Sequence, residues 1–82
     1  MDLRQLRYFL AIAEAGSFTA AAKSLHVSQP ALGYQVKQLE ERYGTPLLER
    51  HSRGIRTTKA GAVLADHARK IMGEVEAAEA AL

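Results

Sequence analysis

Two helical patterns lie only three residues apart between residues 17 and 43, and this spacing leaves few folds open to the chain. The first pattern, from Phe18 to about Leu25, is rich in alanine, whose small side chain lets a second helix approach closely. Ser17 and Ser28 are placed to cap the two helices, because a serine hydroxyl accepts a hydrogen bond from free backbone N–H groups. Two helices joined by so short a turn are typical of a helix-turn-helix.

A further helix is predicted before this motif. Its apolar residues recur at the spacing of one helical face: Leu3, Leu6, Leu10 and Ala13. Gly16 follows as the residue that ends the helix, since glycine readily takes the left-handed conformation of a C-terminal cap. The chain is therefore expected to begin with a run of short, closely packed helices.

A short β-hairpin is predicted after the third helix, which ends near Tyr43-Gly44. Residues 47–50 and 55–57 form its two strands and flank the turn segment His51-Ser52-Arg53-Gly54. Gly54 stands where the turn requires a positive φ.

The last predicted helix begins after a cap at Thr57 or Thr58 and runs about 24 residues, or roughly 36 Å. Its apolar positions step by four and three residues, which is a heptad seam: Leu64, Ala68, Ile71, Val75, Ala78 and Leu82. A seam this long extends beyond what a small core covers, so we expect it to pair two chains as a homodimer. Because the helix has no C-terminal cap, we also expect the chain to be a fragment of a longer protein.

Basic residues gather toward the front of the chain. Residues 1–59 carry nine Lys or Arg and five Asp or Glu, whereas residues 60–82 carry two and four. The net charge of the whole chain is only +2, so the distribution says more than the total. The front part is the candidate for contact with a polyanion such as nucleic acid.

The remaining composition excludes several classes of protein. A chain of 82 residues forms one domain. The absence of cysteine excludes a disulfide scaffold, a Cys-ligated metal site and a thiol nucleophile. No apolar run is long enough to span a membrane, and the N-terminus lacks the apolar core of a signal peptide, so the default compartment is the cytoplasm. His26, His51 and His67 fall in a turn, a hairpin and a remote helix, so no metal site or cofactor is predicted.

Several motifs follow one another in order over residues 3–61: L-x-x-L-x-Y-F, A-G-S-F-T-x-A-A, L-H-V-S-Q-P-A-L, L-E, and L-L-E-R followed by R-G-I-x-x-T-x-A-G. With these motifs the chain resembles the N-terminal domain of LysR-type transcriptional regulators. The resemblance implies a mostly α, winged helix-turn-helix over residues 1–58, with a two-stranded wing at 47–57. It also implies a long linker helix over 59–82, binding of double-stranded operator DNA as a dimer, and a C-terminal effector-binding domain outside this chain. The full-length protein would then form a tetramer and respond to a small-molecule inducer.

The resemblance also implies that the third helix, about 29–42, enters the major groove of DNA. The positions that face the bases in the family match Gln29, Pro30, Gly33 and Tyr34. The Gln29 amide has the geometry to pair with adenine N6 and N7, and Pro30 offers an apolar edge to a thymine methyl. Gly33 and Tyr34 depart from the family pattern, in which Ser or Thr and a basic or small polar residue are common. The operator sequence therefore stays open.

Contacts to phosphate or to the minor groove are expected from the helix starts, the third helix and the wing: Ser17, Thr19, Ser28, Lys37, Arg50, Arg53 and Arg56. The free N–H groups at the start of the second helix favour an anion near Ser17 and Thr19. Arg53, at the hairpin tip, is expected in the minor groove, which attracts arginine most where A·T pairs narrow it. Ser17 and Ser28 also have a purely structural interpretation as helix caps.

Three alternatives remain at this point. The chain could be a winged-helix module that binds protein, although the basic residues of the third helix and wing favour DNA. It could be an enzyme, but the sequence offers no nucleophile–base pair, metal cluster or phosphate-cradling loop. It could belong to another family of dimeric winged-helix repressors, although the N-terminal helix followed directly by S-F-T-x-A-A favours the LysR type.

Overall fold

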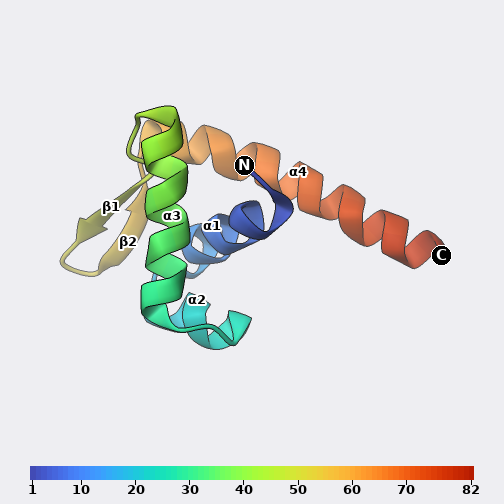
Figure 1. Ribbon diagram of the computed structural model, residues 1–82, viewed down its shortest axis with the longest axis horizontal. Helices are drawn as coiled ribbons and strands as arrows, with labels where there is room; N and C mark the ends of the chain where they lie inside the picture. Colours follow the sequence, from blue (N-terminus) through green and yellow to red (C-terminus); the bar gives the residue numbers. More distant parts are fainter.

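The computed structural model describes residues 1–82 and contains four helices and one two-stranded sheet. The elements in chain order are α1 (Leu3–Ala15), α2 (Phe18–Leu25), α3 (Gln29–Tyr43), β1 (Leu48–His51), β2 (Gly54–Thr57) and α4 (Lys59–Ala81). In Figure 1, α3 has α2 at its N-terminal end and the hairpin along one side, and α4 extends away from both. The predicted mostly α fold with a β wing is confirmed. None of the helices has the length and apolarity needed to cross a membrane.

The predicted serine caps are confirmed in both helices of the helix-turn-helix. Ser17 Oγ accepts a hydrogen bond from the backbone N of Ala20 at 3.1 Å, and Ser28 Oγ accepts one from Ala31 at 3.1 Å. The turn between these helices contains His26, which is the one non-glycine residue with a positive φ, 57°. This left-handed residue turns the chain sharply, so α3 begins close to the end of α2.

Two clusters of buried side chains form the core. The first joins the helix-turn-helix to α1: Ile12, Ala21, Ala22, Leu32 and Val36. The second joins α1 and α3 to the start of the hairpin and to α4: Phe9, Leu39, Leu47 and Ala65. Because Ala65 belongs to the second cluster, the first half of α4 packs as part of the same core as the helices before it.

The buried face of α4 differs from the predicted seam. The residues of α4 that the chain itself buries are Gly61, Ala65, Ala68 and Met72. Ala68 was expected on the dimer seam, but it is fully buried within the single chain, where α4 packs on α1. The heptad pattern did not separate the two faces, because an alanine fits an intrachain helix contact as well as an interchain one. The rest of the seam is half-buried or exposed in the chain: Leu64, Ile71, Val75, Ala78 and Leu82.

The hairpin is anchored on the turn between α1 and α2. Its strands are antiparallel, with Leu48 opposite Thr57 and His51 opposite Gly54, so the turn is two residues long and shorter than expected. The backbone N of Ile55 donates a hydrogen bond to the carbonyl O of Gly16 at 2.9 Å. A Cβ at position 54 would lie 2.5 Å from that same oxygen, so only glycine allows this approach.

Candidate nucleic-acid interface

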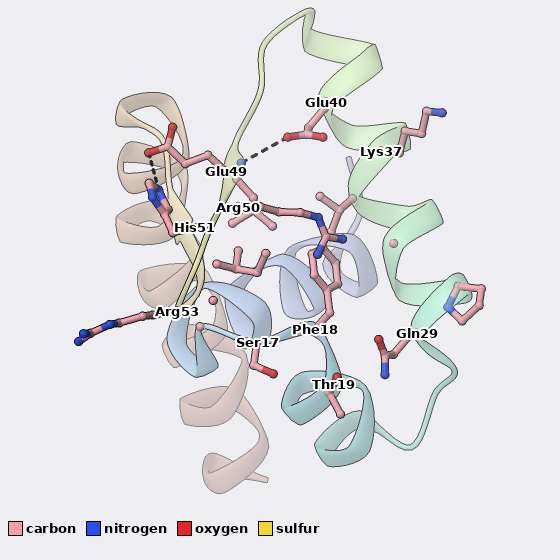
Figure 2. A pocket seen from close by; sticks show the side chains of 17 residues that line it. Ser17, Phe18, Thr19, Gln29, Lys37, Glu40, Glu49, Arg50, His51 and Arg53 are labelled. Carbon is pink, nitrogen blue, oxygen red and sulfur yellow. Dashed lines mark hydrogen bonds and ion pairs between the residues drawn. The ribbon is translucent and has the colours of Figure 1, made fainter.

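A groove of about 850 Å³ opens between α3, the start of α2 and the hairpin. Figure 2 shows its labelled side chains, which come from segments far apart in the sequence. Eight residues predicted to contact DNA line this groove: Ser17, Thr19, Gln29, Pro30, Gly33, Lys37, Arg50 and Arg53. Ser28, Tyr34 and Arg56 were also predicted but do not line it. The fold therefore brings most of the predicted contact residues to one side of the domain.

The outward face of α3 carries the predicted base-reading residues. Gln29, Pro30 and Tyr34 are exposed, whereas Leu32, Val36 and Leu39 hold the opposite face in the core. A Cβ at Gly33 would meet nothing within 4 Å, so packing within the chain does not require glycine there. These residues thus occupy the first two turns of a helix whose polar face is open.

Ser17 and Ser28 serve as caps, and this leaves part of their hydrogen-bonding capacity free. Each hydroxyl oxygen accepts a bond from its own helix, at Ala20 and Ala31 respectively. The hydroxyl hydrogen of each serine remains available to a second acceptor, since a hydroxyl both donates and accepts. Capping and contact with an anion are therefore compatible at both positions.

Arg50 lies across the groove and rests on an aromatic ring. Its guanidinium carbon is 5.1 Å from the centroid of the Phe18 ring, a cation–π contact between β1 and α2. Figure 2 shows the Arg50 side chain extending from β1 toward the α3 side, with Phe18 beneath it. This pairing was not predicted from the sequence, because the two residues are brought together only when the hairpin folds back onto α2.

The other two wing arginines, Arg53 and Arg56, lie in environments that differ from that of Arg50 and from each other. Arg53 stands at the rim of the groove, at the hairpin tip, and its side chain extends outward (Figure 2). Arg56 lies across the strand from Glu49, with its Nε 3.8 Å from the Glu49 carboxylate, and it donates a hydrogen bond to His51 Nε2 at 2.6 Å. Glu49 therefore offsets part of the positive charge of Arg56. From the sequence, the three arginines were predicted as one set. Their different partners depend on the register of the two strands, which places Glu49 opposite Arg56.

Glu40 joins the two walls of the groove. Its Oε2 accepts hydrogen bonds from the backbone N of Leu47 at 2.7 Å and of Leu48 at 3.3 Å. One carboxylate thus links the base of the hairpin to α3. No role was predicted for this residue from the sequence, although Glu40 is the acidic residue of the L-E motif.

The family model described as bacterial regulatory helix-turn-helix protein, lysR family, matches residues 3–62. The HTH-type transcriptional regulator BudR of Klebsiella aerogenes is 50% identical over 78 residues, which cover 95% of this chain and 54% of BudR. The probable cat1 operon transcriptional activator of Acinetobacter lwoffii is 47% identical over 81 residues, which cover 99% of this chain and 27% of the activator. The chain thus spans about half the length of the first relative and about a quarter of the second.

Solved structures with the same fold include two that contain DNA. A BenM_DBD/catB site 1 DNA complex superposes with a TM-score of 0.92 at 44% identity, covering 98% of this chain and 90% of that one. A CbnR_DBD–DNA complex superposes with a TM-score of 0.86 at 48% identity, covering 96% and 91%. The similarity extends over α4 as well as the helix-turn-helix, because the matches cover nearly the whole chain.

Proposed function

Because the chain belongs to the lysR family of bacterial regulatory helix-turn-helix proteins, we propose that it binds double-stranded operator DNA sequence-specifically, as the DNA-binding domain of a transcriptional regulator. The observation that carries this proposal is the groove, which gathers Gln29 of α3, Ser17 of α2 and Arg50 of β1 on one face. The relatives named above are transcriptional regulators rather than enzymes. Residues 1–58 act as the DNA reader and residues 59–82 as the linker helix.

The base contacts are assigned to the exposed turns of α3 in the major groove, which is wide enough to admit a helix. Gln29 reads adenine through its amide, and Pro30 packs on a thymine methyl. Gly33 lets the helix backbone approach the DNA, since no side chain stands there. Tyr34 presents its phenol beside these residues, and its 59% exposure supports this role.

The DNA backbone is assigned to the groove between α3 and the wing. One sugar-phosphate backbone separates the major groove from the adjacent minor groove. With α3 in the major groove and the wing tip in the minor groove, this backbone passes between them. Lys37 and Arg50 supply positive charge along this path, while Ser17, Thr19 and Ser28 supply hydroxyl donors at helix starts. Arg53 enters the minor groove. Arg56 contributes less than Arg53, because Glu49 offsets its charge.

We assign a second copy of the chain as the partner that packs against α4. Its contacts are the seam residues that the single chain leaves half-buried or exposed: Leu64, Ile71, Val75, Ala78 and Leu82. Ala68 supports the seam from inside the chain, since it is fully buried. Such a dimer presents two recognition helices to half-sites about one DNA turn, or roughly 34 Å, apart.

The full-length regulator is assigned a C-terminal effector-binding domain, a small-molecule inducer, a tetrameric assembly and a cytoplasmic location. The lengths of the relatives support the first of these, because the 81 matched residues cover only 27% of the cat1 operon activator.

A selection from random duplex DNA with the 82-residue chain tests the proposal. The expected result is an enriched inverted repeat whose affinity falls steeply with salt, because each neutralised phosphate releases counterions. If nothing is enriched, the selection is repeated with a dimerising coiled coil fused after Leu82. Enrichment in that form assigns the failure to weak dimerisation. Continued failure with a folded chain contradicts DNA reading and favours a protein partner.

A further inference from the structure

Tyr34 and Gln38 form a hydrogen-bonded pair on the open face of α3. They are four residues apart, so their side chains lie on the same face one turn from each other. Gln38 Nε2 donates to the Tyr34 phenol oxygen at 2.6 Å. Both side chains are exposed, and the core of the domain uses the other face of the helix. The pair is therefore not needed to hold the fold together.

The direction of this hydrogen bond decides what the phenol has left to offer. A phenol has one hydrogen to donate and lone pairs that accept. The Gln38 amide occupies the accepting side, and the phenol hydrogen has no acceptor within the chain. Accepting one hydrogen bond also strengthens the bond that the same hydroxyl donates. Tyr34 is thus prepared as a donor toward whatever lies against α3.

The surroundings leave room for such a contact. Gly33 places no side chain beside Tyr34, and a Cβ there would meet nothing within 4 Å. Gln38 also limits the rotation of the phenol before binding, so less conformational freedom is lost when the contact forms.

We propose that Gln38 is a positioning residue that holds the Tyr34 phenol as a hydrogen-bond donor to an acceptor on the DNA. This inference rests on the proposed function and specifies the chemistry of one of its contacts. Two sources offer acceptors to α3. One is the base edge in the major groove, where guanine N7 and O6, adenine N7 and thymine O4 accept. The other is a phosphate oxygen, which carries no sequence information.

The test uses the duplex selected by the 82-residue chain and a set of duplexes in which one base pair at a time is changed. Affinity ratios between duplexes are measured for the wild type and for Tyr34→Phe, Gln38→Glu and Gln38→Lys. An added charge changes the affinity for every duplex by the same factor, so it cancels in the ratio of two affinities. Gln35→Glu is the matched control, since it adds the same charge to α3 as Gln38→Glu and Gln35 makes no side-chain hydrogen bond to Tyr34.

For a base-edge acceptor, Tyr34→Phe should lower the preference at one position by about threefold to tenfold, the effect of one hydrogen bond. Gln38→Glu should lower it equally, because a carboxylate accepts the phenol hydrogen and removes it from the DNA. Gln38→Lys, which only donates, should keep the preference, as should Gln35→Glu. When Tyr34→Phe is already present, Gln38→Glu should have no further effect. A 7-deaza purine at that position then identifies whether N7 is the acceptor.

For a phosphate acceptor, Tyr34→Phe should weaken binding to all duplexes by the same factor. A methylphosphonate at a single position should then remove the difference between wild type and Tyr34→Phe. Sequence-specific binding by the wild type, with no effect of Tyr34→Phe on either ratio or affinity, overturns the inference and leaves the proposed function standing. Loss of preference in Gln38→Lys as well overturns the assigned direction of the hydrogen bond. Failure of the wild type to bind any duplex, even as a fused dimer, overturns both.

Discussion

The Arg50 guanidinium lies over the Phe18 ring, 5.1 Å from its centroid, and so a charge from the wing is held in place by a residue of the helix-turn-helix. An unsupported arginine on a hairpin samples many rotamers, and fixing it on binding costs conformational entropy. The ring lowers that cost by holding the guanidinium across the groove before DNA arrives. The position of the wing charge thus depends on α2 as well as on the hairpin itself.

Phe18→Leu should therefore weaken DNA binding by about 0.5–1 kcal/mol, the size of an exposed cation–π contact. The measurement is affinity for the selected duplex, with thermal unfolding to confirm that the variant is folded. In an Arg50→Ala background the same change should have little further effect on affinity. Additive losses in the double variant would mean that Phe18 acts on DNA binding independently of Arg50.

Gly61→Ala should destabilise the domain, even though alanine is the better helix former. A Cβ at this position would lie 1.9 Å from the carbonyl O of Leu47, so α4 must move away from the core. The expected loss is about 1–3 kcal/mol in the free energy of unfolding, as for other overpacked sites. Gly73→Ala is the matched control in the same helix, where a Cβ meets nothing within 4 Å. It should stabilise the domain by about 0.5–1 kcal/mol, and chemical denaturation distinguishes the two signs.

Gln29→Ala should weaken binding to the selected site by about 1–3 kcal/mol and relax the preference at one base pair. The reason is the loss of a bidentate amide contact to an adenine edge. Competition between the selected duplex and singly changed duplexes measures both quantities. Equal losses for specific and non-specific DNA would contradict a base-reading role.

Arg53→Ala should reduce the slope of log affinity against log salt by about one, because one positive charge that displaces counterions from the minor groove is lost. Arg56→Ala should reduce it less, since the Glu49 carboxylate lies 3.8 Å from the Arg56 Nε and offsets its charge. Binding isotherms at several salt concentrations measure both slopes. A larger effect of Arg56→Ala than of Arg53→Ala would contradict the assignment of Arg53 as the stronger DNA contact.

Ile71→Glu should weaken association of two chains while leaving the single chain folded. Ile71 is 38% exposed and lies outside the intrachain face of α4, so the charge meets solvent in the monomer but an apolar seam in the dimer. Sedimentation equilibrium measures the association, and circular dichroism the fold. The control Lys70→Glu changes the charge at the neighbouring position, off the predicted seam. An unchanged dimer in Ile71→Glu would place the interface elsewhere.

Helix boundaries were predictable because their causes are local. The serine caps and the glycines at positions 16 and 44 act within a few residues of themselves, and the structure ends α1 and α3 at those glycines. The hairpin was located correctly, but its turn is shorter than expected. The structure adds a strand pair between His51 and Gly54, and Gly54 lies against the carbonyl of Gly16 in a distant segment, which the local pattern does not show.

The dimer seam illustrates the limit of periodicity. A step of three and four residues identifies the apolar side of α4, but it does not distinguish contact with α1 from contact with a second chain. Ala68 is fully buried within the single chain, in the helix that packs on α1. The side chain of Ile71 remains exposed in the same structure.

The family, the order of the elements and the bounds of α3 could all be predicted from the sequence, since caps, spacing and ordered motifs are properties of neighbouring residues. Three relationships of the contact face could not be predicted in this way: Arg50 on Phe18, Glu40 bridging to the hairpin, and Glu49 beside Arg56. Each joins residues from different elements. Their distances depend on how helices and strands pack, and packing is a property of the whole core rather than of any one segment.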